Sequence, residues 1–319
     1  MTDVPAVRPS LAEDRVGRAP VHPIFASRDP DRAIVRWVNR GLGWLPWPWG
    51  EDIMAALGVA QAVLRPARFR QALDWAAAQP GCRTPRRLAI SLLAHHGRFI
   101  AQDAYVGIRT ADQLRATLIA VGLDHLRQRT PGRGLILLGF HLGPVGTPRA
   151  LQILGYRVNA AISGRRHRAT LPLTSGGGET IPLYGASRQG EASALRRAVE
   201  LLRAGEIVYI TADGRVGTES FQIPLPGGPL VVRAGWLALR RLTGAVTHPV
   251  LMHVEGPRRV ITIHPALPPP APGPDDDVAS CRAALTPLIE EYVRRFPEQC
   301  RSLALWYRSA GAPVERGAD

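Results

Sequence analysis

The chain has 319 residues, 45% of them apolar, which is enough for one large domain or two small ones with a packed core. Forty basic residues stand against 26 acidic ones, giving a net charge of +14, and every basic residue is arginine. The absence of lysine excludes an internal Schiff base to a pyridoxal cofactor and a GxxxxGK[ST] phosphate loop. The positive excess favours anionic partners such as nucleic acid, an anionic membrane surface, acidic carrier proteins or phosphorylated substrates, although GC-rich coding also enriches arginine.

Residues 1–30 hold five prolines among mixed charges and are predicted to be a flexible N-terminal arm. A helical layer is expected over 31–128. Within it, the Trp-rich stretch 41–50 precedes an apolar helical run at 53–64, which suits a membrane interface as well as packing against the core. The apolar spacing predicts helix throughout 84–128.

From residue 130 the pattern changes to short apolar runs that alternate with helical periodicity. Strands are expected at 134–140, 155–162, 206–211, 245–254 and 259–264, and helices at 145–154, 191–203, 231–242 and 278–296. This alternation predicts an α/β layered sandwich with a mostly parallel central sheet flanked by helices. We therefore expect a single α/β domain over 31–308, with its sheet core at 130–265, a C-terminal segment at 278–308 and a flexible tail at 309–319.

The most promising catalytic residue is His141, which follows directly on the strand at 134–140. Open α/β sheets place their sites at the carboxyl ends of strands. Gly143 and Gly146 would let a substrate approach the backbone closely, and the helix that follows would offer N–H groups to an anion. A histidine here can take a proton from a hydroxyl or an amine, while the alternative is a structural histidine at a tight turn.

Two further groups of polar residues follow predicted strands. Asp213 and Arg215 come after the strand at 206–211, where Asp213 would orient a histidine, bind a polar head group or simply form a turn. Arg165 and Arg166 belong to an arginine-rich segment after the strand at 155–162. Arginines suit a phosphate or the phosphopantetheine arm of a carrier, and a solvated basic loop is the other interpretation.

Several chemistries lack their motifs. The segment 185–190 has one residue too many for a GxSxG elbow, and 175–178 does not form a GxGxxG turn. The remaining histidines have no paired ligands in sequence, so we expect neither a metal nor a resident cofactor. No RNA-binding RNP sequence or zinc finger supports a nucleic-acid partner.

The three cysteines are widely spaced and form no CxxC pair, which suits a reducing cytoplasm. The N-terminus lacks the basic and then apolar run of a signal peptide, and no apolar stretch reaches the length of a spanning helix. We expect a cytoplasmic protein that can lie peripherally on the inner face of the cell membrane.

The order of these segments resembles the lysophospholipid acyltransferase superfamily, and most closely the branch of the lipid A lauroyl/myristoyl acyltransferases. The resemblance covers roughly 130–308. It is carried by the strand that ends in His141-Leu-Gly-Pro, by a helix followed by Leu154-Gly-Tyr-Arg-Val, by the strand that ends in Asp213, by the loop 221–229, and by Pro297-Glu-Gln with a later Trp306.

The resemblance implies transfer of a fatty acyl group from acyl-ACP or acyl-CoA to a hydroxyl or amine of a lipid-like acceptor, with His141 as general base. The family's histidine is followed five residues later by an acid, whereas this chain has Gly146 at that position. Asp213, Glu179 or a backbone carbonyl would then have to support His141. The alternative is a catalytically impaired module of the same fold that binds a lipid or a carrier protein.

Overall fold

The fold is described from a computed structural model, which defines residues 41, 45–106, 110–127, 132–144, 146–163, 178–183, 188–213 and 219–305. The predicted arm at 1–30 and tail at 309–319 lie outside these residues, as does Trp306. Within the described part of the chain, no helix combines the length and the apolar character needed to cross a membrane.

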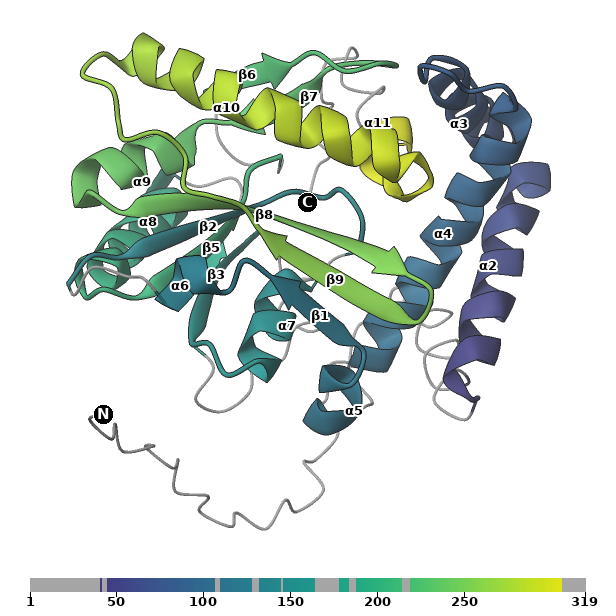
Figure 1. Cartoon of the computed structure of the whole chain (residues 1–319), viewed down its shortest axis with the longest axis horizontal. Helices are drawn as coiled ribbons and strands as arrows, with labels where there is room; N and C mark the ends of the chain where they lie inside the picture. The colour runs from purple at the N-terminus through teal and green to yellow at the C-terminus, as the bar shows by residue number, and fades with distance from the viewer. Residues whose placement is uncertain are drawn as a thin grey trace, which may run out of the picture.

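The described elements up to Arg115 are helices, and from Leu118 to Ile263 strands are interspersed with helices (Figure 1). The helices are α2 (Trp47–Leu64), α3 (Pro66–Ala77), α4 (Pro85–Val106), α5 (Ala111–Arg115), α6 (Asp124–Arg127), α7 (Thr147–Ile153), α8 (Arg188–Arg203), α9 (Gly235–Thr243), α10 (Pro274–Arg295), the 3₁₀ turn η2 (Pro297–Gln299) and α11 (Arg301–Leu305). The strands are β1 (Leu118–Val121), β2 (Leu135–Gly139), β3 (Val158–Ser163), β4 (Thr180–Leu183), β5 (Ile207–Thr211), β6 (Ser220–Ile223), β7 (Leu230–Arg233), β8 (Val246–Glu255) and β9 (Arg258–Ile263).

The central sheet has the strand order β1-β9-β8-β2-β5-β3-β4. Among the described pairings it is parallel except between β8 and β9. β2 lies between β8 and β5 and is parallel to both, with Gly139 opposite Thr211. The predicted α/β class and the mostly parallel sheet with its N-terminal helical segment are confirmed. The carboxyl ends of β2 and β5 therefore meet at one edge, which is where His141 and Asp213 follow.

Both faces of the sheet are covered (Figure 1). Because side chains alternate along a strand, Leu135 and Leu137 of β2 pack on one side with α6 and α7, whereas Ile136 and Leu138 face the other side. α8 and α9 cover one end of that second side, and α10, the β6–β7 hairpin, α3 and α4 cover the rest. The five residues of β2 are completely buried, as a strand with helices on both faces should be.

Two glycines allow the helices α2 and α4 of the N-terminal layer to pack closely against each other. A side chain at Gly97 would come within 1.8 Å of the Met54 carbonyl oxygen, and one at Gly58 within 2.3 Å of the Leu93 carbonyl oxygen. α2 and α4 therefore touch through their backbones and run antiparallel. This close contact fixes which face of α2 points outward.

The prediction of helix throughout 84–128 is wrong at its C-terminal end. Residues Leu118–Val121 form β1, which pairs with β9 at the edge of the sheet. Four apolar residues fit a helical or an extended pattern equally well. The hydrogen-bonding groups of β9 decide the outcome, and Gly122 passes close to the Ile263 carbonyl, where a Cβ would lie 2.1 Å away.

The predicted helix at 231–242 is wrong at its start. Leu230–Arg233 form β7, which pairs antiparallel with β6 as a hairpin, and α9 begins only at Gly235. Val231 and Val232 favour the extended state because they are branched at Cβ. β4 and β6, which are four residues each, were not among the predicted strands.

Candidate active site

His141 stands at the end of the buried central strand β2, separated from it by Phe140. The imidazole is neither sealed nor fully exposed, since 29% of the side chain is accessible. A ring in this position can meet a substrate that arrives at the carboxyl edge of the sheet.

Asp213 follows β5, the neighbour of β2, and its carboxylate is completely buried. Oδ1 of Asp213 lies 2.9 Å from Nδ1 of His141. Both carboxylate oxygens also accept from the His141 backbone N–H, each at 2.9 Å. One buried acid therefore holds the ring and the main chain of the same histidine.

This contact sets the protonation chemistry of His141. An ionised carboxylate only accepts hydrogen bonds, so Nδ1 of His141 is the nitrogen that carries the proton and Nε2 presents the lone pair. Burial lowers the pKa of His141, but the charge of Asp213 and its hydrogen bond raise it by more, while Arg301 lowers it further. The net pKa lies above the ordinary 6.5. The arrangement suits a general base at Nε2.

The segment before and after His141 is packed tightly against its neighbours. A Cβ at Gly139 would lie 2.0 Å from the Tyr209 hydroxyl, which bonds to Thr147 and Thr211. Burial raises the pKa of Tyr209 to about 12, so it stays a neutral phenol. Gly143 has φ +73°, and a Cβ there would meet the Met252 carbonyl oxygen at 2.1 Å. The smallness of Gly143 is thus required by packing, and its role in substrate binding stays a prediction.

The C-terminal segment contacts the same loop from the other side. Ser302 of α11 donates to the His141 carbonyl oxygen at 2.6 Å, and the Gly143 N–H donates to the Gln299 carbonyl oxygen at 3.2 Å. Sequence reasoning assigned these residues no role. Gln299 did belong to the Pro-Glu-Gln segment on which the resemblance rests, which was the only available signal.

Arg301 and His96 form a second buried contact behind the loop. Nη1 of Arg301 lies 3.2 Å from Nδ1 of His96, and its guanidinium sits over the Phe99 ring at 5.3 Å. Burial, followed by the charges of Arg301 and Arg68, lowers the pKa of His96 to about 3. His96 is therefore the neutral acceptor for Arg301.

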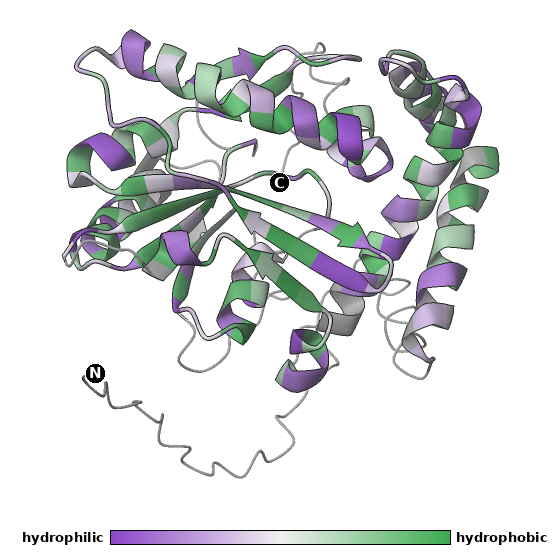
Figure 2. Ribbon diagram, in the orientation of Figure 1, coloured by the Kyte–Doolittle hydropathy of each residue, from purple (hydrophilic) through white to green (hydrophobic). Residues whose placement is uncertain are grey.

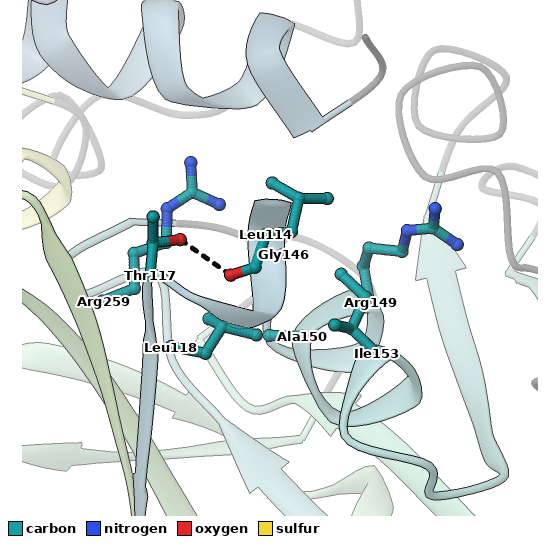
Figure 3. Close-up of a pocket in the computed structure, with 8 residues that line it drawn as sticks. All are labelled: Leu114, Thr117, Leu118, Gly146, Arg149, Ala150, Ile153 and Arg259. Atoms are coloured by element: carbon teal, nitrogen blue, oxygen red, sulfur yellow. Dashed lines mark hydrogen bonds between the residues drawn. The ribbon is translucent and has the colours of Figure 1, made fainter. Parts of the chain in front are cut away.

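Gly146, which stands where the resembling family has its acid, precedes α7 with φ +104°. Among the described residues, no atom lies within 4 Å of the place where a Cβ would be. It lines a small pocket between α5, β1 and α7, in which Thr117 donates to the Leu114 carbonyl at 2.8 Å (Figure 3). Arg149 and Arg259 extend on opposite sides of this pocket. Nε and Nη1 of Arg149 are buried and have no hydrogen-bond acceptor among the residues that the structure describes. Arg149 thus brings hydrogen-bond donors close to Gly146.

The other candidate acid is engaged elsewhere. Glu179 lies beside the edge strand β4, and both of its carboxylate oxygens accept from Arg197, at 2.6 and 2.8 Å. Arg165, Arg166 and Arg215 lie outside the described residues, so their part in substrate binding stays a prediction. Within the described part of the chain, no three His, Cys, Asp or Glu residues are grouped so that they could hold a metal ion.

Comparison with protein families identifies a match that covers most of the chain. Residues 27–304 match the model of a family described as bacterial lipid A biosynthesis acyltransferase. The match spans most of the chain and includes His141, Asp213 and the Gln299–Ser302 segment. No curated protein matches the chain significantly.

Proposed function

Because the chain belongs to the bacterial lipid A biosynthesis acyltransferase family, we propose that it moves a fatty acyl group from an acyl-ACP or acyl-CoA thioester to a hydroxyl or amine of a lipid-like acceptor. His141 is the general base of this reaction and Asp213 is its positioning residue. The observation that carries the proposal is the 2.9 Å contact between Nδ1 of His141 and the buried carboxylate of Asp213.

The reaction needs only groups that the donor, the acceptor and His141 supply. Nε2 takes the proton from the acceptor hydroxyl or amine as its oxygen or nitrogen attacks the thioester carbonyl carbon. The C–S bond then breaks, and the imidazolium returns the proton to the leaving thiolate. Asp213 stabilises the imidazolium between these steps, as the acid of a Ser-His-Asp triad does.

Asp213 also supplies the acid that is missing at Gly146, the position five residues after His141. An acid five residues after the histidine would reach it from the same loop, whereas Asp213 reaches Nδ1 from the neighbouring strand β5. The orienting role is therefore filled from another part of the chain. This favours an active enzyme over the impaired lipid- or carrier-binding module of the same fold.

The charge of the chain supports an anionic donor. A net charge of +14 attracts both an acidic carrier protein and the phosphates of CoA. Arg149, whose Nε and Nη1 are buried without an acceptor in the described part of the chain, lines the same pocket as Gly146. We propose that arginines of this kind hold anionic groups of the donor or of the acceptor.

The outer face of α2 supports contact with a membrane that carries the acceptor. Trp49, Ile53, Leu57 and Leu64 recur at helical spacing, and 45–78% of each is exposed. α2 is an outer helix of the molecule, and apolar residues extend along it (Figures 1 and 2).

Exposed arginines lie at the C-terminal end of this apolar stripe. Arg65 follows α2 directly, and the antiparallel packing brings the exposed Arg86 and Arg87 at the start of α4 to the same end. Apolar residues flanked by arginines fit the surface of an anionic bilayer. We propose that α2 lies on such a surface.

The test is acyl transfer by the purified protein. Radiolabelled acyl-ACP and acyl-CoA are each offered with a bacterial lipid extract, and the lipids are separated by chromatography. We expect a labelled lipid product that depends on the protein and disappears in His141→Gln. Equal product from the variant would remove His141 from the mechanism. Retention of acyl donor without any turnover would support the binding module instead.

A further inference from the structure

A C-terminal segment that takes no part in the proposed chemistry contacts the carbonyl oxygen of His141. Ser302, whose side chain is fully buried, donates to the His141 carbonyl oxygen at 2.6 Å. Two residues on, the Gly143 N–H donates to the Gln299 carbonyl oxygen at 3.2 Å. The His141–Gly143 loop is thus hydrogen-bonded at both ends to η2 and α11.

Gln299 is itself fixed to the sheet. Its side-chain oxygen accepts from the Val254 N–H and its amide donates to the Val254 carbonyl, both at 2.9 Å. Val254 lies near the end of β8, the other neighbour of β2. Gln299 therefore uses its side chain to fix its position against β8 and its main chain to hold the loop.

Arg301 ties the same segment to the helical layer. It donates to His96 and lies over Phe99, and both of these residues belong to α4. Ser302 is the next residue, so the main chain that carries its hydroxyl is held in place by this contact. The segment is anchored to two elements that are themselves part of the core.

These contacts complete the restraint on His141. Asp213 holds its N–H and its ring, and Ser302 holds its C=O. When both backbone polar groups of one residue are bonded, its peptide planes and the direction of its side chain are defined. A displacement of about 1 Å at a reacting group can cost roughly a hundredfold in rate, so orientation at this level matters for catalysis.

We propose that Ser302 and Gln299 are positioning residues, forming a clip from η2 and α11 that sets the orientation of His141 for proton abstraction. The inference rests on the proposed function of His141 as general base. The clip acts through His141 and touches no substrate.

The test compares Ser302→Ala, which removes the hydroxyl, with Ser302→Cys, which keeps the size but donates more weakly. Ile207→Val is the control, because Ile207 is equally buried but starts β5 at the opposite end of the strand from Asp213. For Ser302→Ala we expect kcat to fall about thirtyfold with KM changed less than about twofold, and Ser302→Cys to lie between Ala and wild type. The control keeps the kcat of the wild type.

Amide exchange at Gly143 gives a readout that does not depend on turnover. Ser302→Ala should speed exchange of the Gly143 N–H about tenfold more than Ile207→Val does, because the clip that holds its acceptor is loosened. Wild-type kcat and an unchanged exchange rate in Ser302→Ala would overturn the proposal. Faster exchange in a protein without any transferase activity would keep the clip and refute the proposed function.

Discussion

Replacing Asp213 by Asn removes the negative charge from the buried partner of His141 while keeping its size. In the wild type, the carboxylate accepts hydrogen bonds from the main-chain N–H and from Nδ1 of His141, in three contacts of 2.9 Å each. An asparagine has one acceptor oxygen and one donor NH₂ group. In either orientation of the amide, its NH₂ group faces the donating main-chain N–H of His141. Where the NH₂ group also faces Nδ1, the ring must carry its proton on Nε2, which then cannot act as a base.

The expected loss follows from this change of tautomer. Asp→Asn in a Ser-His-Asp triad lowers turnover about 10⁴-fold, so we expect kcat of Asp213→Asn to fall by roughly 10³ to 10⁴, or about 4–5 kcal/mol in the barrier. One buried polar contact also becomes unfavourable, at a cost of about 1–3 kcal/mol in the free energy of unfolding. Thermal unfolding measured in parallel separates the two effects.

The pH dependence of kcat/KM gives an independent test of the role of Asp213. The base must be deprotonated, so the rate rises with pH through the pKa of His141, which Asp213 raises above 6.5. Without the carboxylate, burial and Arg301 remain, and both lower the pKa. The acid limb of kcat/KM should therefore move from above pH 6.5 to below about 6.5 in Asp213→Asn.

Protonation of His141 also contributes to stability. Because its folded pKa is raised, the protonated pair stabilises the fold fully below the unfolded pKa of about 6.5, and this contribution is lost as the pH rises through the folded pKa. Asp213→Asn removes this contribution. A variant with kcat within about tenfold of wild type and an unmoved acid limb would refute the reasoning that links Asp213 to the base.

Other predictions concern residues around the site. Gly146→Glu, which places an acid at the family's position, should leave the rate within about twofold and cost about 1 kcal/mol because of the positive φ; a tenfold gain in rate would show that Asp213 is not the effective partner. Between pH 7 and pH 5, the free energy of unfolding of the wild type should fall by about 2 kcal/mol more than that of His96→Gln, because only the unfolded state protonates His96 in that range. An equal change in the two proteins, measured by denaturant unfolding at both pH values, would contradict this. Leu57→Glu should weaken binding to phosphatidylglycerol vesicles about tenfold in sedimentation, whereas Leu242→Glu, a similarly exposed leucine on α9, should not; equal effects would remove α2 from the membrane surface.

The place of His141 was predictable because a short, wholly apolar run directly before it indicates a buried strand. The choice among its acidic partners was not. Asp213 and Glu179 each lie next to a short strand, and the chain gives no strand order. In the sheet, β5 lies beside β2, which brings Asp213 to His141. β4 lies at the edge of the sheet, where Glu179 pairs with Arg197.

Contacts that depend on distant segments were missed for the same reason. Ser302 lies 161 residues from His141, and a serine in a short C-terminal segment gives no local signal of its partner. The edge strand β1 was mistaken for helix because four apolar residues satisfy either period, and only the pairing with β9 decides. The helices α4 and α8, with many turns of regular periodicity, were predicted correctly in their main extent.

The state of the His141 ring tests the account most directly, and it needs no substrate. Nitrogen-15 labelled histidine allows its tautomer and its titration to be followed by NMR in the intact protein. We predict a neutral ring with its proton on Nδ1 and a pKa above 6.5, shifted down in Asp213→Asn. A ring that carries its proton on Nε2, or that titrates below its ordinary range in the wild type, would contradict the assignment of His141 as a base held by Asp213.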